Sequence, residues 1–199
     1  MAIRFRQVLR TAAALVAISG ATAQAQSRSG IVNVRIETTL GVITAALDSA
    51  HAPVTVANFL RYVDAHAYDS GVFHRTVRAD NQPHDSVRIG VIQGGANAKR
   101  PSLAPIELER TSTTGLKHLD GTLSMARAGP NTATSDFFIC VGDQPALDFG
   151  GHRNLDGQGF AAFGRVTSGM DVVKAIQRGN ANGQTLSPPV VITSIRRGA

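Results

Sequence analysis

The sequence has 199 residues, and its 20 lysines and arginines against 14 aspartates and glutamates give a formal net charge of +6. Hydrophobic residues make up 43% and charged residues 17%, so the composition excludes a disordered chain and fits one domain of ordinary size, or at most two very small ones. A single cysteine excludes an intrachain disulfide framework, and the absence of a run of about twenty apolar residues argues against a membrane span.

The first 25 residues have the order of a secretory signal peptide. Three basic residues come first, without an acid among them: Arg4, Arg6 and Arg10. An apolar run follows at 11–18, and Ala23 and Ala25 supply the small residues of a cleavage site. An amphipathic surface helix is the alternative, but the run has no polar face. We therefore expect 1–25 to be a signal peptide and 26–31 a flexible lead-in, and we expect the protein to be exported to the periplasm.

Much of the excess positive charge belongs to that first segment. Removal of its three arginines leaves 17 basic against 14 acidic side chains, and the remaining arginines are scattered over the chain. No run of lysine or arginine with interleaved aromatic residues remains, so a nucleic-acid partner is not expected.

Alternating apolar side chains predict a β-hairpin at the start of the domain. Apolar and polar residues alternate over 32–36, Gly41 marks a turn, and a second alternating run covers 43–47. Pro53 can open a helix, because its missing N–H is tolerated in the first turn. The apolar residues that follow have the spacing of one buried helical stripe: Val56, Phe59, Leu60 and Val63.

The rest of the chain consists mainly of short apolar runs separated by Gly, Asn and Pro. Each has the length of a strand: 72–77, 89–93, 122–125, 137–141, 160–166 and 190–195. A second helix is expected over 168–178, with Asp171 in its first turn, Lys174 and Arg178 in its last, and Gly179 as its stop. Many short strands with two helices predict a β-barrel or sandwich with helices at its ends.

Residue types that often carry chemistry form no familiar site here. The six histidines lack metal-ligand spacing, so we expect them in the core or on the surface, and no metal or cofactor is expected. Cys140 lies in an apolar strand, which favours a buried thiol over a nucleophile. Residues 149–159 lack the ligand periodicity of a calcium loop and are expected to be a plain surface insertion.

Several motifs occur together in a fixed order: Phe73-His74-Arg75, Gln93-Gly94-Gly95, Leu123-Ser124-Met125-Ala126-Arg127-Ala128-Gly129-Pro130-Asn131-Thr132, Ser135-Asp136-Phe137-Phe138-Ile139 and Phe163-Gly164-Arg165-Val166. With them the chain resembles the cyclophilin family of peptidyl-prolyl cis–trans isomerases over about residues 32–197. The resemblance implies a mainly β fold for 32–199, a closed eight-stranded barrel capped by two α-helices. It also implies Pro-containing peptides or unfolded proteins as substrates, and we expect a monomer.

The isomerisation of an X–Pro bond needs neither a nucleophile nor a metal. Rotation is slow because the C–N bond has partial double-bond character, with a barrier of ~18–20 kcal/mol. A catalyst must therefore bind the twisted amide better than either planar form. In the twisted state the prolyl nitrogen regains its lone pair, and a fixed guanidinium can donate a hydrogen bond to it.

The resemblance assigns roles to eight residues. As catalytic residues it implies Arg75 as the donor to the prolyl nitrogen, Gln93 as a partner of the substrate backbone, and Phe138 as the floor of the proline pocket. Five further residues match positions that bind substrate: Val91 and Leu147 as apolar walls, Ala126 and Arg127 in the groove, and Phe160 at the position of a late pocket histidine. For the apolar residues taken singly, core packing is the alternative. For Arg75 the alternative is a surface ion pair.

The sequence also departs from the family pattern. Gly90 stands where relatives place a large apolar residue, so that wall is missing or supplied elsewhere, and Ala146 stands at the family's tryptophan position. Asp136 replaces a glutamine and is expected close enough to Arg75 or Arg127 to act on them electrostatically. These departures keep a second function open, a binding or chaperone module of low activity for Pro-containing chains.

Overall fold

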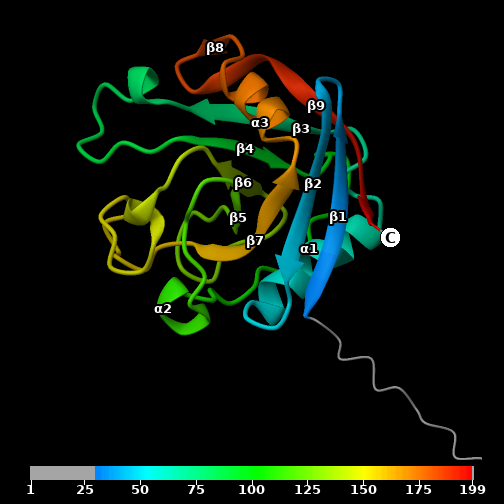
Figure 1. The fold of residues 1–199 in the computed structure, drawn as a ribbon, viewed down its shortest axis with the longest axis horizontal. Helices are drawn as coiled ribbons and strands as arrows, with labels where there is room; N and C mark the ends of the chain where they lie inside the picture. The colour runs from blue at the N-terminus through cyan, green and yellow to red at the C-terminus, as the bar shows by residue number, and fades with distance from the viewer. Residues whose placement is uncertain (1–29, 199) are drawn as a thin grey trace, which may run out of the picture.

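The computed structural model describes residues 30–198, and within them one antiparallel sheet of nine strands forms the body of the protein (Figure 1). The strands are β1 (Ile31–Thr38), β2 (Gly41–Asp48), β3 (Gly71–Val77), β4 (Val91–Gly95), β5 (Thr122–Met125), β6 (Phe137–Cys140), β7 (Ala161–Ser168), β8 (Ala181–Asn182) and β9 (Thr185–Arg197). Their order is β1-β2-β7-β5-β6-β4-β3-β9-β8, and β1 also pairs with β9. That pairing closes eight strands into a barrel, as predicted, and β8 is a two-residue addition that pairs with β9.

Two helices lie against the barrel, as expected. They are α1 (Pro53–Asp64), which has Pro53 in its first turn, and α3 (Met170–Gln177), which follows Gly169. Figure 1 shows α1 and α3 at opposite ends of the barrel. A further short helix, α2 (Thr111–Thr114), was not predicted, and it ends at Gly115 with a φ of 74°. Within the described residues, no helix has the length and apolar character needed to cross a membrane.

The last strand is longer than the sequence predicted. β9 begins at Thr185 rather than Val190 and runs through Pro188 and Pro189. Its register with β3 jumps from Val190, opposite Phe73, to Thr185, opposite Arg75, so both prolines fall in the irregular part of the ladder. Because ladder N–H groups are not needed at such a bulge, prolines are tolerated there.

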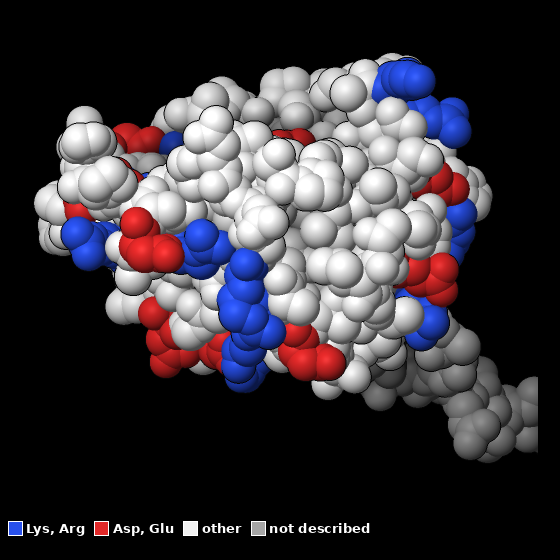
Figure 2. Space-filling view, turned by 90° about the horizontal axis from the view of Figure 1, so that it is seen from above, with Lys and Arg blue, Asp and Glu red and all other residues white. Residues whose placement is uncertain are grey.

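At the other end of the chain, the expected signal peptide and nearly all of the expected lead-in lie outside the described residues. The boundary at 31 is wrong, because Ile31 is the first residue of β1 and pairs with Asp48. Charged side chains of both signs are interspersed on the face drawn in Figure 2. Among the described residues, surface ion pairs include Arg196–Asp69 and Arg197–Asp64.

Alternation along the strands creates two separate apolar clusters. Phe137 and Ile139 of β6 point into the barrel and belong to the main core. Phe138 and Cys140 point outward and form a second cluster, to which Val91 of β4 also belongs. The barrel therefore carries a small apolar patch on its outer wall, where β4 pairs with β6.

Candidate active site

A cavity of about 600 Å³ opens over this outer patch. Every residue predicted for the site lines it: Arg75, Val91, Gln93, Ala126, Arg127, Phe138, Leu147 and Phe160. They come from β3, β4, β6, the segments beside β5 and β7, and a short 3-10 turn at 145–147 that contains Leu147. Strand pairing thus brings together residues far apart in the sequence. The alternative of simple core packing fails for Val91, Phe138 and Leu147, because they lie outside the main core and face the cavity.

The floor and walls of the cavity are apolar. Phe138 is 4% exposed, and the ring of Phe160 meets it edge-on at 5.3 Å between centroids. Ile89, which the sequence placed only in a strand, lines the cavity and supplies the wall that Gly90 lacks. Gly90 itself is confined by the main chain, because a Cβ there would lie 2.8 Å from the carbonyl oxygen of Val141. The pocket is therefore rebuilt with a neighbouring side chain.

A buried hydrogen-bonded chain supports the Phe138 ring. The His118 imidazole stacks on Phe138 with 5.9 Å between ring centroids and 15° between their planes. Its Nδ1 lies 2.8 Å from Asp148 Oδ1, and its Nε2 lies 2.9 Å from Ser124 Oγ. Burial raises the pKa of Asp148, but the hydrogen bonds from His118 and the electrostatic attraction of His118 and Lys117 together outweigh it, so the net shift is downward. Although this is the residue set of a nucleophilic triad, Ser124 is fully buried, so no substrate reaches it and the chain serves to hold the ring.

Among the described residues, the hydrogen-bond partners of the Arg75 guanidinium are neutral, and two of its N–H groups form no hydrogen bond. Its Nη1 donates to Gln93 Oε1 at 3.0 Å, and its Nε and Nη2 donate to Gln184 Oε1 at 3.0 and 2.5 Å. A guanidinium has five N–H donors, so one on Nη1 and one on Nη2 remain for a ligand. Within residues 30–198 no carboxylate forms an ion pair with Arg75, so the surface ion pair is excluded there as its role. Burial lowers the pKa of the Arg75 guanidinium.

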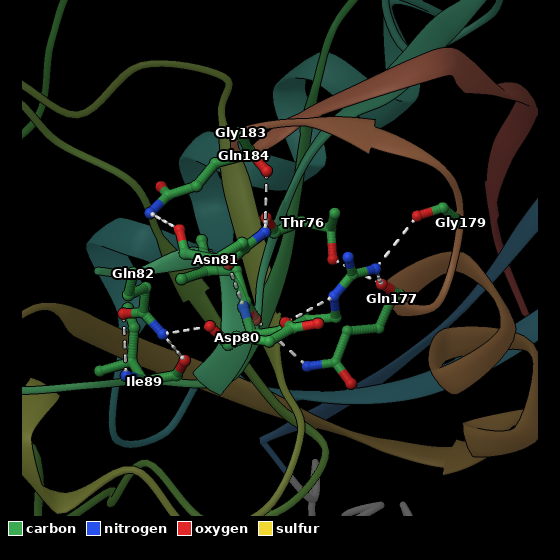
Figure 3. Close-up of polar contacts among 11 residues, drawn as sticks. Thr76, Asp80, Asn81, Gln82, Ile89, Gln177, Gly179, Gly183 and Gln184 are labelled. Carbon is green, nitrogen blue, oxygen red and sulfur yellow. Dashed lines mark hydrogen bonds and ion pairs between the residues drawn. The ribbon is translucent and has the colours of Figure 1, made fainter.

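Gln184, which sequence reasoning missed, sits in the two-residue turn between β8 and β9. Its main-chain oxygen accepts from the Thr76 N–H at 2.9 Å, and its Nε2 donates to the Asn81 carbonyl oxygen at 3.3 Å. Asn81 in turn donates from Nδ2 to the Gly183 and Thr76 carbonyl oxygens, both at 3.0 Å (Figure 3). The turn signal at Gly183 was visible in the sequence, but only the closed sheet shows that this turn reaches Arg75.

Arg127, which the resemblance placed only in the groove, also has side-chain contacts that shape the cavity. Its side chain is 1% exposed, and its Nη1 and Nη2 donate hydrogen bonds of 2.7 and 2.9 Å to the Asp156 carboxylate. These hydrogen bonds lower the pKa of that carboxyl. The guanidinium lies 5.0 Å from the centroid of the Phe160 ring, within cation–π distance. Both partners belong to, or directly follow, the 149–159 insertion.

That insertion is not the plain surface loop we expected. Arg153 and Asn154 line the cavity. Arg153 Nη1 forms an ion pair with Asp85 Oδ2 at 3.1 Å and donates a hydrogen bond to the Val87 carbonyl oxygen at 2.7 Å. The insertion therefore forms a wall of the cavity. No local sequence pattern indicates these contacts, because the residues that they join are 29 and 66 positions apart.

Asp136 lies beside Gln93 rather than beside an arginine. Its Oδ2 accepts from Gln93 Nε2 at 3.4 Å, and Gln93 contacts Arg75, so the expected influence on Arg75 is indirect. The expected electrostatic effect of Asp136 on Arg127 is not seen as an ion pair, because the carboxylate that pairs with Arg127 is that of Asp156.

Comparisons with known proteins agree with this geometry. Residues 33–197 match the family model of cyclophilin-type peptidyl-prolyl cis-trans isomerases. A peptidyl-prolyl cis-trans isomerase of Streptomyces antibioticus is 38% identical over 82% of this chain and 96% of its own. Peptidyl-prolyl cis-trans isomerase A of Dickeya dadantii is 34% identical over 98% of both chains. A crystal structure of a cyclophilin-type isomerase from Cryptosporidium parvum is similar in fold, with a TM-score of 0.69 and 22% identity over 85% of this chain and 98% of that one.

Proposed function

Since this chain belongs to the cyclophilin-type peptidyl-prolyl cis-trans isomerases, we propose that it assists the folding of exported proteins and that Arg75 drives the reaction from the cavity on the outer barrel wall. The observation that carries the mechanism is the guanidinium of Arg75, held by two glutamine oxygens with two N–H groups left over at the edge of an apolar pocket.

In this mechanism the proline ring rests on Phe138, between the walls Val91, Leu147 and Ile89. The apolar walls exclude water from the amide, which favours the less polar twisted form over the planar ones. As the amide twists, its nitrogen becomes an acceptor, and the free N–H groups of Arg75 donate to it. Neutral partners suit this role, because a carboxylate bonded to the guanidinium would weaken its donation to the substrate.

The size of the free-energy barrier explains why the hydrogen bond from Arg75 and the apolar pocket are both needed. One charge-assisted hydrogen bond contributes about 1.5–3 kcal/mol, or one to two powers of ten in rate. The barrier of ~18–20 kcal/mol leaves a larger reduction to be supplied by desolvation and by anchoring of the flanking peptide. Gln93 supports the anchoring, because its amide lies between Arg75 and Asp136 on the cavity wall.

The export part of the proposal is supported by the N-terminal sequence alone. Arg4, Arg6 and Arg10, the apolar run 11–18 and the pair Ala23 and Ala25 have the order of a signal peptide. Intact-mass measurement of the protein from its native host tests this, with a mature chain expected to begin at or near Gln26. A full-length cytosolic protein would overturn it.

The mechanism is tested by an isomerisation assay on short X–Pro peptides. Arg75→Ala should lower kcat/KM at least about tenfold while the melting temperature changes little. Arg75→Lys should restore only part of the lost kcat/KM, because an ammonium group cannot bond to both glutamines as the planar guanidinium does. Unchanged activity in Arg75→Ala would refute the mechanism. If the wild type binds such peptides without accelerating their isomerisation, the binding-module function is the correct one.

A further inference from the structure

The cavity is lined by one acidic side chain that lacks an arginine or lysine partner among the described residues. Asp85 is paired with Arg153, but Asp136 contacts only the Gln93 amide at 3.4 Å and the His74 imidazole at 3.7 Å. The Asp136 side chain is 42% exposed, so its carboxylate meets the solvent of the cavity. A carboxylate in this state attracts a cation that enters from outside.

The backbone that carries Asp136 is fixed on several sides. Its carbonyl oxygen accepts from the Ala126 N–H at 2.9 Å, and the preceding Ser135 carbonyl oxygen accepts from Tyr68 Oη at 2.8 Å. The carboxylate packs on Gly95, where any Cβ would collide with it. The position of the charge is therefore set before a ligand arrives, so little ordering is needed when one binds.

Asp136 and Phe138 stand two residues apart and line the same cavity. Along extended backbone this spacing is about 7 Å, and an extended peptide places its own alternate side chains on one side at the same interval. A peptide that lies extended along β6 with its proline on Phe138 would therefore place the side chain two residues away beside Asp136. The neighbouring lining residues Ala128 and Thr132 are small and exposed, which leaves room for a long side chain.

We propose that Asp136 makes this isomerase selective for X–Pro segments that carry lysine or arginine two residues from the proline, and that it disfavours aspartate or glutamate there. This specificity rests on the proposed function, because it requires the proline to occupy the pocket over Phe138. The selected clients are basic segments of unfolded chains.

The test compares kcat/KM for three matched peptides that carry Lys, Ala or Glu two residues before the proline, and three with the same changes two residues after it. At low salt we expect the Lys peptide to exceed the Glu peptide by about tenfold on one flank only, because the attraction of Lys and the repulsion of Glu by a half-exposed charge each contribute about threefold. The preference should shrink as salt is added, because added ions screen the contact.

Asp136→Asn removes the charge without changing the shape and should bring the Lys-to-Glu ratio close to one. The matched control is Asp171→Asn on α3, an exposed acid outside the cavity lining, which changes the net charge equally and should keep the ratio. Equal rates for Lys and Glu peptides in the wild type, or an unchanged ratio in Asp136→Asn, would overturn the specificity while leaving the isomerase mechanism standing. No isomerisation of any peptide would overturn the mechanism and the specificity with it.

Discussion

Replacement of Gln184 tests whether the orientation of Arg75 limits catalysis. Gln184 accepts two of the three hydrogen bonds that hold the guanidinium, at 3.0 and 2.5 Å, and the third goes to Gln93. Gln184→Ala leaves Arg75 bound by one contact, free to turn about its long side chain. Hydrogen bonds to a charged group are worth about 1.5–3 kcal/mol each, but water replaces much of this at a half-buried site. We expect a net loss of about 1.4 kcal/mol, which is tenfold in kcat/KM.

A second variant separates orientation from charge. Gln184→Glu keeps an oxygen in place for the Nε and Nη2 donors but adds a negative charge against the guanidinium. Its donation to the twisted amide should weaken, so kcat should fall while KM changes less. Asn182→Ala is the control, since Asn182 lies exposed on the same hairpin. Melting temperatures of all three variants show whether the hairpin stays folded.

The decisive measurement is protease-coupled or NMR-detected isomerisation of a short Ala-Pro peptide. Wild-type kcat and KM in Gln184→Ala, with an intact fold, would show that Gln93 alone orients Arg75 and that the Gln184 contacts are incidental. A loss equal to that of Asn182→Ala would refute the reasoning in the same way, because it would reflect the hairpin in general.

Three further measurements test other parts of the structure. Cys140 is buried, and burial raises the pKa of its thiol, so a thiol reagent should react with it only after unfolding. Although burial raises the pKa of Asp148, its hydrogen bonds from His118 and its attraction to His118 and Lys117 together lower it below the ordinary 3.8. This stabilisation is therefore complete above that value and is lost as pH falls through the folded pKa. Urea unfolding should show Asp148→Asn less stable by about 1–2 kcal/mol at pH 7, with the difference shrinking below pH 4. Asp156→Asn should free the 149–159 wall from Arg127 and raise its amide hydrogen exchange by about tenfold or more, and unchanged exchange would contradict that role.

Local patterns predicted the elements well because each depends on near neighbours in the chain. Alternation in 32–36 and 43–47 identified the first hairpin, and helical spacing after Pro53 identified α1. The last strand was underestimated because two prolines argue against a strand unless a bulge accommodates them, and the bulge depends on the pairing of β9 with β3.

The residues of the site also fall into those that local motifs predicted and those that depend on long-range contacts. The resemblance placed all eight predicted residues at the cavity, because the motifs that carry it also line the outer patch. It missed Gln184, which reaches Arg75 across 109 positions of sequence, and Arg153, which reaches Val87 across 66. Contacts of this length are set by barrel closure and by an insertion that departs from the family pattern, so neither periodicity nor motif spacing reveals them.

The pairing of β1 with β9 joins strands from opposite ends of the described residues. Until β9 pairs, β1 and β3 each have one edge that offers unpaired backbone to other chains. Pairing across such a separation is slow compared with local folding. The same closure brings the β8–β9 turn to Arg75, so a chain in which β9 has not yet paired has neither a closed barrel wall nor the Gln184 contacts of the guanidinium. The candidate active site of this isomerase is therefore complete only when its own barrel has closed.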